Sequence, residues 1–369
     1  MKLTLPQKDL ADAVLNIQRA VSSKSTVPAL EGILLKAQGQ ELELSAYDLE
    51  LGMTTTLPAS IEEEGRIVLT ARLLGDIIRR MPGESVTLTS DEKNVTYIKS
   101  GASEFSLVGI PGEEFPEFPA VSDTKGFSIS QPLLKSMIRQ TLFAVSDSDS
   151  KPVHTGSLFE LSQGQLRVVS VDGYRLAMRT EPVKAEEDMK FVVPGKTLAE
   201  VLKLLKDSEE DISVFVGRRH VLFRIGAYTV LSSLLEGEFL DYRAAIPSAG
   251  TTEVVAGTRP LMDSVERVSL LITDRLKSPI RTVFEEGEIR LFCSTAMGRA
   301  SDQVACQMEG ARVEIGFNNR YLLDALRNSD GDEVRLILNG PLSPMKVLPK
   351  EGESFLFLVL PVRLKSEEF

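Results

Sequence analysis

The 369-residue chain has few of the side chains that carry most enzyme chemistry. It contains two histidines, His154 and His220, and two cysteines, Cys293 and Cys306. This nearly excludes a histidine–nucleophile pair and a multi-histidine metal site. Two cysteines are too few for a disulfide framework, and too far from other ligands for a zinc site. Because both cysteines fall in strand-like runs, we expect them to be buried free thiols.

The chain also lacks long apolar runs. None approaches the roughly 20 residues that a membrane helix needs. The first residues, Met1–Leu5, alternate like a strand and lack the apolar core of a signal peptide. We therefore expect a cytoplasmic protein. Its net charge of −11 argues against a simple nucleic-acid coat protein.

What the chain does have is one charge pattern three times, at a constant offset of 124 residues. A base is followed by an acid four residues later and by a second base three residues after that. On a helix these charges lie within about 60° of one another, and the opposite face is apolar. The copies are Arg72/Asp76/Arg79, Lys196/Glu200/Lys203 and Arg320/Asp324/Arg327, and the apolar positions are Leu73, Leu74, Ile77, Ile78 and Met81, then Leu198, Val201, Leu202 and Leu205, then Leu322, Leu323 and Leu326. We predict three copies of one domain, at residues 1–120, 121–248 and 249–369.

Each copy is predicted to contain two amphipathic helices and two groups of strands, which is an α+β architecture of two sheet-plus-helix halves. The helices are expected at residues 7–21, 71–81, 131–145, 195–206, 258–272 and 318–327. Together they carry +7, so the rest of the chain carries −18. The ordinary explanation is solvated helix faces with ion pairs worth a few tenths of a kcal/mol each. Three copies in register weigh against it and favour a basic surface that faces one way.

Two stretches are expected to be linkers, and the apolar run at the C-terminal end of copy three can be interpreted in two ways. Gly112–Pro119 and Gly237–Pro247 combine glycine, proline and acidic residues with aromatics. Copy three instead ends in the apolar run Leu358–Leu364. That run is either a final strand docked in a sheet or the lining of a groove for partners.

Domain size restricts how three copies can be used. A 120-residue domain has a radius of gyration of about 14 Å and a diameter of roughly 35 Å. Three such spheres in a ring leave a hole of about 5 Å and six leave about 35 Å, whereas duplex DNA is on the order of 20 Å wide. Only a ring of two chains could therefore encircle DNA, with copy one of each chain meeting copy three of the other.

Several segments resemble the bacterial DNA polymerase III β subunit, the β sliding clamp family, over essentially the whole chain. They are Val27-Pro28, Val171-Asp172-Gly173-Tyr174-Arg175-Leu176, Phe317-Asn318 with Tyr321-Leu322-Leu323, and Leu360-Pro361-Val362-Arg363-Leu364. The resemblance implies half of a closed ring of clamp-fold domains, with helices inside and sheets outside. It implies a non-catalytic homodimer that encircles duplex DNA without sequence preference and needs no cofactor or metal.

The resemblance also implies partners and sites. The partners are the catalytic subunit of DNA polymerase III, a clamp-loader complex, and other polymerases and repair proteins that dock short linear motifs. DNA would be contacted by Lys24, Arg72, Arg79, Arg139, Lys196, Lys203, Arg320 and Arg327. The peptide groove would comprise Val171, Gly173, Tyr174, Arg175, Leu176, Leu240, Asn318, Tyr321, Leu342, Pro344, Leu358, Leu360, Pro361, Val362, Arg363 and Leu364. The dimer interface would pair Phe105 and Leu107 with Leu271 and Ile272 of the other chain.

The sequence departs from the family at several of these positions. The family often has histidine at Tyr174, methionine at Leu360 and Val362, and arginine at Lys24, where lysine loses the bidentate geometry. The segment Ser146–Lys151 carries two acids, and five residues, Lys365–Phe369, follow the groove segment. For Arg175 the alternative role is a structural salt bridge.

Two other functions compete with a clamp. An enzyme would have its best case in Asp172, Arg175 and Asp302 at a domain cleft, but no glycine-rich phosphate loop or nucleophile elbow accompanies them. A repeat scaffold that binds only proteins would be an open, monomeric arc without a topological hold on DNA.

Overall fold

The computed structural model describes residues 1–122, 125–185, 187–273 and 275–364. These residues form two compact units. Unit 1 contains Met1–Pro132 and Ala199–Leu234, and unit 2 contains Leu133–Leu198 and Leu235–Phe369. The tail Lys365–Phe369, which follows the proposed groove segment in the sequence, lies outside the described residues.

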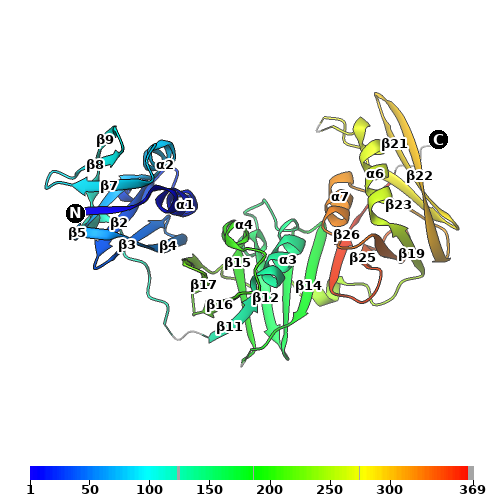
Figure 1. Cartoon of the computed structure of the whole chain (residues 1–369). Helices are drawn as coiled ribbons and strands as arrows, with labels where there is room; N and C mark the ends of the chain where they lie inside the picture. Colours follow the sequence, from blue (N-terminus) through cyan, green and yellow to red (C-terminus); the bar gives the residue numbers. More distant parts are fainter. Residues whose placement is uncertain (123–124, 186, 274, 365–369) are drawn as a thin grey trace. The chain divides into compact units, whose positions relative to one another are not determined.

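Six longer helices each follow a strand within one residue, so the chain repeats a strand–helix unit (Figure 1). The helices are α1 (Gln7–Ile17), α2 (Ala71–Arg80), α3 (Gln131–Leu142), α4 (Gly195–Leu204), α6 (Thr258–Val268) and α7 (Asn319–Arg327). Helices α2, α4 and α7 begin at residues 71, 195 and 319, which confirms the 124-residue period. None of the helices in the described ranges is long and apolar enough to cross a membrane.

The short helical turns lie in the segments outside these six helices and the strands. Helix α5 was not expected, because it falls in the second linker. The turns are α5 (Tyr242–Ala245), η1 (Gln18–Ala20), η2 (Pro28–Glu31), η3 (Gly112–Glu114), η4 (Pro152–Thr155) and η5 (Ser269–Leu271).

The helices bury the faces that their periodicity predicts. In α2 the side chains of Leu74 and Ile78 are fully buried, and Arg72 and Arg79 are exposed. Each fully buried leucine or isoleucine contributes about 1.5–3 kcal/mol. One expectation is wrong: Leu73, assigned to the apolar face, is 48% exposed. Its position follows Arg72 by 100°, at the rim of the buried stripe.

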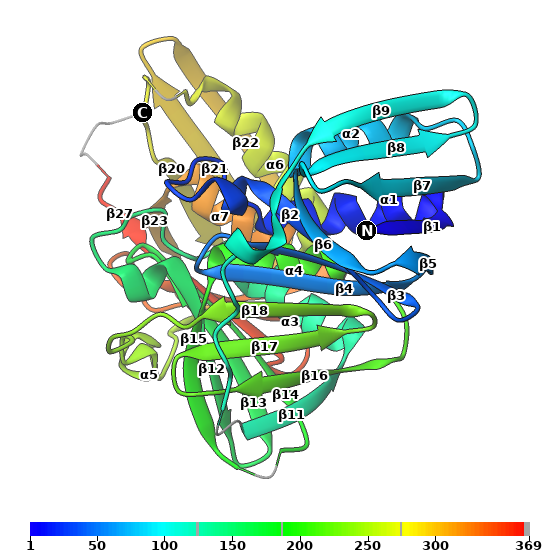
Figure 2. The same ribbon diagram turned by 90° about the vertical axis from the view of Figure 1, so that its left-hand side faces the viewer.

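Unit 1 contains two antiparallel sheets. The five-stranded sheet runs β5 (Ser60–Glu63), β1 (Lys2–Pro6), β7 (Ser85–Ser90), β8 (Val95–Ser100) and β9 (Ser103–Val108). The nine-stranded sheet runs β10 (Ile110–Pro111), β6 (Gly65–Thr70), β2 (Gly32–Gln38), β3 (Glu41–Tyr47), β4 (Leu51–Pro58), β18 (Tyr228–Ser233), β17 (His220–Ile225), β16 (Asp211–Val216) and β11 (Lys125–Ser130). Figure 2 shows β4 beside β18, where strands from copies one and two pair directly.

Unit 2 contains one sheet of thirteen strands. Copies two and three join where β14 pairs with β26, for example at Leu176 and Leu358. The order is β15 (Met189–Pro194), β12 (Gly156–Ser162), β13 (Gln165–Val171), β14 (Arg175–Pro182), β26 (Phe355–Val359), β25 (Met345–Pro349), β24 (Glu333–Leu338), β19 (Thr252–Gly257), β22 (Gly298–Gly310), β21 (Glu288–Thr295), β20 (Ile280–Glu285), β23 (Val313–Phe317) and β27 (Pro361–Val362).

The linker aromatics pack as anchors. Phe118 contacts Tyr47 and Phe115 at ring-centroid distances of 5.0 and 6.3 Å. In the second linker, Phe239 and Tyr242 are buried in a core shared with strands of both copies. Aromatic pairs of this kind add about 0.5–1.5 kcal/mol beyond the area they bury. The linkers therefore hold the start of the next copy against the last one.

The cysteines match the expectation in part. Both thiols are free, and Cys293 is buried, but Cys306 is only half-buried. Cys306 lies where β22 leaves its pairing with β21 and begins to pair with β19, so one side of the strand is uncovered there. Burial raises the pKa of both thiols.

Candidate nucleic-acid interface and partner groove

The proposed DNA-contacting bases are exposed without exception. They lie on helices α2, α3, α4 and α7, except Lys24, which lies in the segment between η1 and η2. The eight are Lys24, Arg72, Arg79, Arg139, Lys196, Lys203, Arg320 and Arg327. All of them could therefore reach a phosphate from the protein surface.

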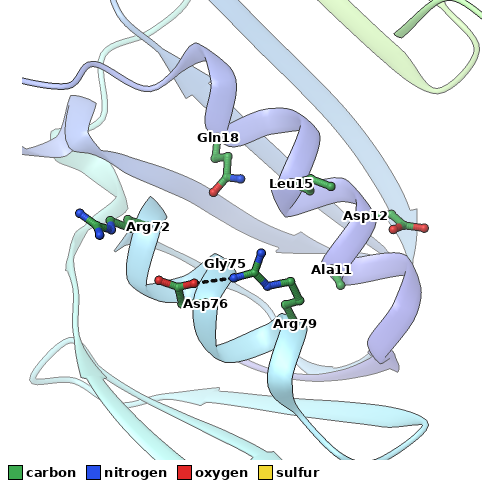
Figure 3. Close-up of a pocket in the computed structure, with 8 residues that line it drawn as sticks. All are labelled: Ala11, Asp12, Leu15, Gln18, Arg72, Gly75, Asp76 and Arg79. Atoms are coloured by element: carbon green, nitrogen blue, oxygen red, sulfur yellow. Dashed lines mark hydrogen bonds and ion pairs between the residues drawn. The ribbon is translucent and has the colours of Figure 1, made fainter. Parts of the chain in front are cut away.

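A cleft of about 400 Å³ separates the two helices of copy one (Figure 3). Its lining comprises Ala11, Asp12, Leu15 and Gln18 of α1 and Arg72, Gly75, Asp76 and Arg79 of α2. Asp76 Oδ1 accepts hydrogen bonds from Arg79 Nη2 at 2.8 Å and from Arg80 Nη1 at 3.0 Å. The bond from Arg80 lowers the pKa of Asp76, so this face carries both signs of charge at neutral pH.

Lys203, Arg139 and Arg327 each have a carboxylate partner too. Lys203 Nζ lies 2.7 Å from Glu200 Oε1, and Arg139 Nη2 lies 2.7 Å from Asp330 Oδ1. Arg327 Nη2 lies 2.8 Å from Glu266 Oε1. Exposed pairs of this kind contribute only about 0–1 kcal/mol, so a phosphate can displace the carboxylate at little cost. The resulting surface would hold DNA weakly.

The turn between β13 and β14 is built around one carboxylate. Asp172 Oδ1 accepts hydrogen bonds from the backbone nitrogens of Tyr174, at 2.9 Å, and Arg175, at 3.0 Å. Gly173 has φ +90°, a conformation that glycine adopts without the strain a side chain would add. This turn presents Tyr174, which is 61% exposed, at the surface.

Tyr174 stacks on Tyr321 of α7, with ring centroids 5.9 Å apart and planes 18° from parallel. The Arg175 guanidinium packs against two rings: its central carbon lies 4.7 Å from the centroid of the Tyr321 ring and 5.5 Å from the centroid of the Phe143 ring. Its Nε donates to Asp172 Oδ2 at 2.9 Å and its Nη1 donates to Asp324 Oδ2. With its side chain 13% exposed, Arg175 fits the structural alternative better than direct contact with a peptide backbone.

Of the two interpretations of Leu358–Leu364, the docked strand is confirmed, and the groove for partners stays a prediction. Residues Phe355–Val359 form β26 inside the sheet, and Pro361–Val362 form β27 on the edge of β23. The segment also lines a cleft of about 720 Å³. The cleft residues are Glu314, Ile315, Gly316, Pro341, Leu342, Pro361, Val362, Arg363 and Leu364.

The proposed groove residues differ in how far they are exposed. Leu342 (78% exposed), Leu240 and Val362 are accessible, whereas Val171, Leu176 and Leu358 are buried in the core beneath them. Asn318 caps α7, since its Oδ1 accepts from the backbone nitrogen of Arg320. Partly exposed positions are Pro344, Leu360, Pro361 and Leu364. The buried group would support a groove rather than touch its occupant.

Four cleft residues were missed from the sequence: Glu314, Ile315, Gly316 and Pro341. The repeat gives no signal for the first three, because they come next to the groove through the pairing of β23 with β27, whereas Pro341 directly precedes the predicted Leu342. Gly316 lies opposite Val362, and a Cβ on Gly316 would come within 2.7 Å of a Leu364 side-chain carbon. Glycine at this position lets Leu364 pack against the strand.

The proposed interface residues lie at an edge strand and at a turn. Strand β9 is the edge of the five-stranded sheet, where Phe105 is 46% exposed and Leu107 is nearly buried. Leu271 and Ile272 are half-buried at the end of η5. Two neighbours that the sequence did not single out, Val108 and Leu270, are 79% and 80% exposed.

The residue group suggested for an enzyme is not assembled. Asp172 and Arg175 are in contact, but Asp302 pairs with Arg267, whose Nε lies 2.6 Å from Asp302 Oδ2. The hydrogen-bonded carboxylate of Asp302 has a lowered pKa despite partial burial. Asp302 therefore serves to hold β22 against α6.

Helix-on-sheet repeats with exposed basic helix faces, together with the matches below, define a DNA sliding clamp of the α+β, three-domain type. Models of the DNA polymerase III beta subunit match its N-terminal domain to residues 1–119, its central domain to 128–241 and its C-terminal domain to 243–363. The chain belongs to the DNA polymerase III beta subunit family.

The similar proteins match this chain over nearly its full length. A beta sliding clamp of Bacillus subtilis is 31% identical, covering 98% of this chain and 100% of the relative. A solved Bacillus subtilis sliding clamp has a TM-score of 0.96 at 30% identity, covering 99% of this chain and 100% of that one. A putative beta subunit from Eubacterium rectale has a TM-score of 0.94 at 35% identity, covering 98% and 99%. The chain is accordingly a non-catalytic replication protein, which removes the enzyme alternative.

Proposed function

We propose that two chains close head to tail into a ring that encircles duplex DNA and tethers DNA polymerase III to it. The observation that carries the proposal is the threefold basic helix face, at a period that the helix starts reproduce. Six copies in a ring give this repetition a purpose, since each presents bases to the same duplex. We assign the three domains of each chain to residues 1–120, 121–248 and 249–369, and the ring to the cytoplasm.

Phosphates, rather than base edges, are the contacts of this surface. Lysine and arginine on helix faces meet the backbone of any sequence equally, so sliding costs little. The carboxylates Asp76 and Glu200 pair with neighbouring bases and reduce the positive charge. Retention on DNA then comes from the closed ring and not from direct affinity.

Partners dock a short apolar peptide in the groove between copies two and three. The accessible side chains Tyr174, Leu240, Leu342 and Val362 supply apolar walls, and Arg363 supplies a charge at the rim. Buried anchors in such a trough carry most of a peptide's binding energy. We propose as its ligands the polymerase catalytic subunit, the clamp loader, and other polymerases and repair proteins.

The ring closes through β9 of one chain and copy three of the other. An edge strand with exposed Phe105 and Val108 is a ready partner for another strand. Within the described part of copy three, Gly298–Ala305 of β22 pairs with β21 alone, which leaves one strand edge near Leu270 and Leu271. Pairing these edges would cover both.

The decisive test loads the purified protein onto nicked circular DNA with a competent clamp loader. We expect the protein to stay on the circle and to leave once the circle is linearised. Equal retention on both forms would indicate simple charge binding. Absence from both forms, with a monomer in sedimentation, would favour the protein-only scaffold.

A further inference from the structure

Leu240, the exposed apolar residue of the second linker, stands in the chain between two buried aromatic residues. Phe239 directly precedes it, and Tyr242 follows it by two residues. Both aromatic side chains belong to the core cluster that also contains the buried groove residues Leu176 and Leu358. Two residues of chain span at most about 7 Å, so Leu240 lies close to that core. The linker thus holds an exposed leucine next to the residues beneath the proposed groove.

Tyr242 is held in place by a hydrogen bond to a neighbouring strand. Its hydroxyl donates to Oε2 of Glu160 in β12, and Arg243 Nη2 donates to the same oxygen at 2.6 Å. The central carbon of the Arg243 guanidinium also lies 4.8 Å from the centroid of the Tyr242 ring. Hydrogen bonds to a carboxylate are about twice as strong as those between neutral groups. The hydroxyl therefore fixes Tyr242 in addition to the packing of its ring.

Both partners are in the protonation state that this bond requires at neutral pH. Burial and the bond to Glu160 raise the pKa of the Tyr242 hydroxyl, so it keeps the proton that it donates. Burial opposes the ionisation of Glu160, but the hydrogen bonds from Tyr242 and Arg243 lower its pKa, so it accepts as a carboxylate. The Glu160 side chain is only 13% exposed, so water competes weakly for it.

The first linker follows the same plan without this bond. The 124-residue period places Phe118, which has no hydroxyl, at the position of Tyr242. It places Lys36, whose ammonium group cannot accept a hydrogen bond, at the position of Glu160. Phe118 instead contacts the ring of Tyr47, with centroids 5.0 Å apart. The bond from hydroxyl to carboxylate is therefore an addition to the repeat, made at the junction where the groove is proposed.

We propose that Tyr242 is a positioning residue for peptide binding, because its hydrogen bond to Glu160 holds Leu240 in place as a wall of the groove. The proposal rests on the groove proposed above. Tyr242 is itself buried and acts through Leu240. Without the bond the linker gains freedom, which it loses again when a peptide packs on Leu240. Ordering one side chain at an interface weakens binding by roughly two- to tenfold.

The experiment measures the dissociation constant of the full-length protein for a fluorescent peptide with leucine and phenylalanine anchors, by anisotropy. Tyr242→Phe removes the hydroxyl and keeps the ring. Leu240→Ala removes the side chain that is positioned, and a third variant combines the two substitutions. The matched control is Tyr228→Phe, since the Tyr228 hydroxyl also has a hydrogen-bond partner, Asn16 Nδ2 at 2.9 Å. Tyr228 belongs to unit 1, whereas the proposed groove residues belong to unit 2.

We expect Tyr242→Phe to weaken peptide binding about fivefold and Tyr228→Phe to leave it unchanged. In the combined variant, Tyr242→Phe should add nothing to the effect of Leu240→Ala, because the positioned side chain is gone. A merely structural role would weaken binding by the same factor in both backgrounds. Circular dichroism and the thermal midpoint show whether each variant is folded. Glu160→Ala, which removes the acceptor in place of the donor, gives the same test if Tyr242→Phe does not fold.

Two results would overturn the proposal. In the first, the folded Tyr242→Phe variant binds the peptide as tightly as the unaltered protein does. In the second, the loss of the hydroxyl weakens binding equally with and without the Leu240 side chain. If the unaltered protein does not bind the peptide at all, the proposed groove itself is refuted, and the role of Tyr242 with it.

Discussion

The salt dependence of DNA binding tests the charge count of the helix faces. Eight bases are proposed to face DNA, and carboxylates bonded to Arg79, Arg139, Lys203 and Arg327 offset part of their charge. If each chain that contacts the duplex neutralises about four phosphates, the slope of log K against log salt is about −3.6 per chain.

Two substitutions on α2 should change this slope in opposite directions. Arg72→Gln removes one positive charge, and we expect a slope of about −2.7 per contacting chain. Asp76→Asn removes the carboxylate that holds Arg79 and Arg80, and we expect about −4.5. The measurement is fluorescence anisotropy of a labelled linear duplex over a series of potassium chloride concentrations.

A base on the sheet side provides the matched control. Arg66 of β6 is exposed like Arg72 and has one carboxylate partner, Glu113, at 2.6 Å. Arg66→Gln should leave the slope unchanged, because a ring with helices inside keeps β6 away from DNA. If Arg66→Gln and Arg72→Gln shift the slope equally, binding is a property of total charge and the assignment of an inner face is wrong.

Three further predictions concern assembly and stability. Replacing the half-buried Leu271 and Ile272 by alanine should shift the dimer toward monomer in analytical ultracentrifugation. Leu49→Ala, which truncates an exposed leucine outside the assigned interface, should not. An unaltered dimer in the first variant would refute the assigned interface. Arg175→Ala removes the cation from Asp172, whose side chain is 12% exposed, and from the half-buried Asp324, and it should lower the free energy of unfolding in urea by about 3 kcal/mol. Arg259→Ala, which breaks an exposed pair, should cost no more than about 1 kcal/mol. Burial lowers the pKa of His154 and His220 in the folded chain from the ordinary value of 6.5, so the unfolded chain binds more protons and the thermal midpoint should fall as the pH drops below 6.5. The double variant His154→Gln, His220→Gln should flatten this part of the plot of thermal midpoint against pH. An unchanged plot would show that other groups cause the fall.

The sequence predicts the repeat well because periodicity is a local signal. Charge spacing and apolar spacing on one helix depend on neighbouring residues alone, so all six helices appear where 3.6-residue periodicity puts them. Errors occur at the rims of the stripes, as at Leu73, and where a linker forms a turn of its own, as at α5. Some helices also end a few residues before the apolar pattern ends: α3, for example, ends at Leu142, whereas the pattern predicted residue 145.

The groove was predictable only in part, because it is made by pairing between distant strands. The apolar character of Leu358–Leu364 is visible in the sequence, but its neighbours Glu314 and Ile315 become neighbours only when β27 joins β23. The role of Arg175 depends on Asp324, 149 residues away, and on two rings. No spacing rule connects such residues, so resemblance to a family suggested a peptide contact where the geometry favours an internal support.

The repeat also explains why we assign the proposed groove to one of the two described junctions between copies and not to both. The turn before β4 matches the turn before β14: Asp48 Oδ1 accepts from the backbone nitrogens of Glu50 and Leu51 as Asp172 Oδ1 does from Tyr174 and Arg175. The next strand also docks alike, with Ser233 donating to the Glu50 carbonyl as Leu360 donates to that of Tyr174. Yet the turn of copy one places an acid where the aromatic wall would stand and a buried leucine where the guanidinium would lie. After Ser233 the chain continues toward the second linker, whereas after Leu360 it forms β27 along the cleft. The backbone plan is thus repeated at both junctions, and the side chains that could hold an apolar peptide are present only at the second.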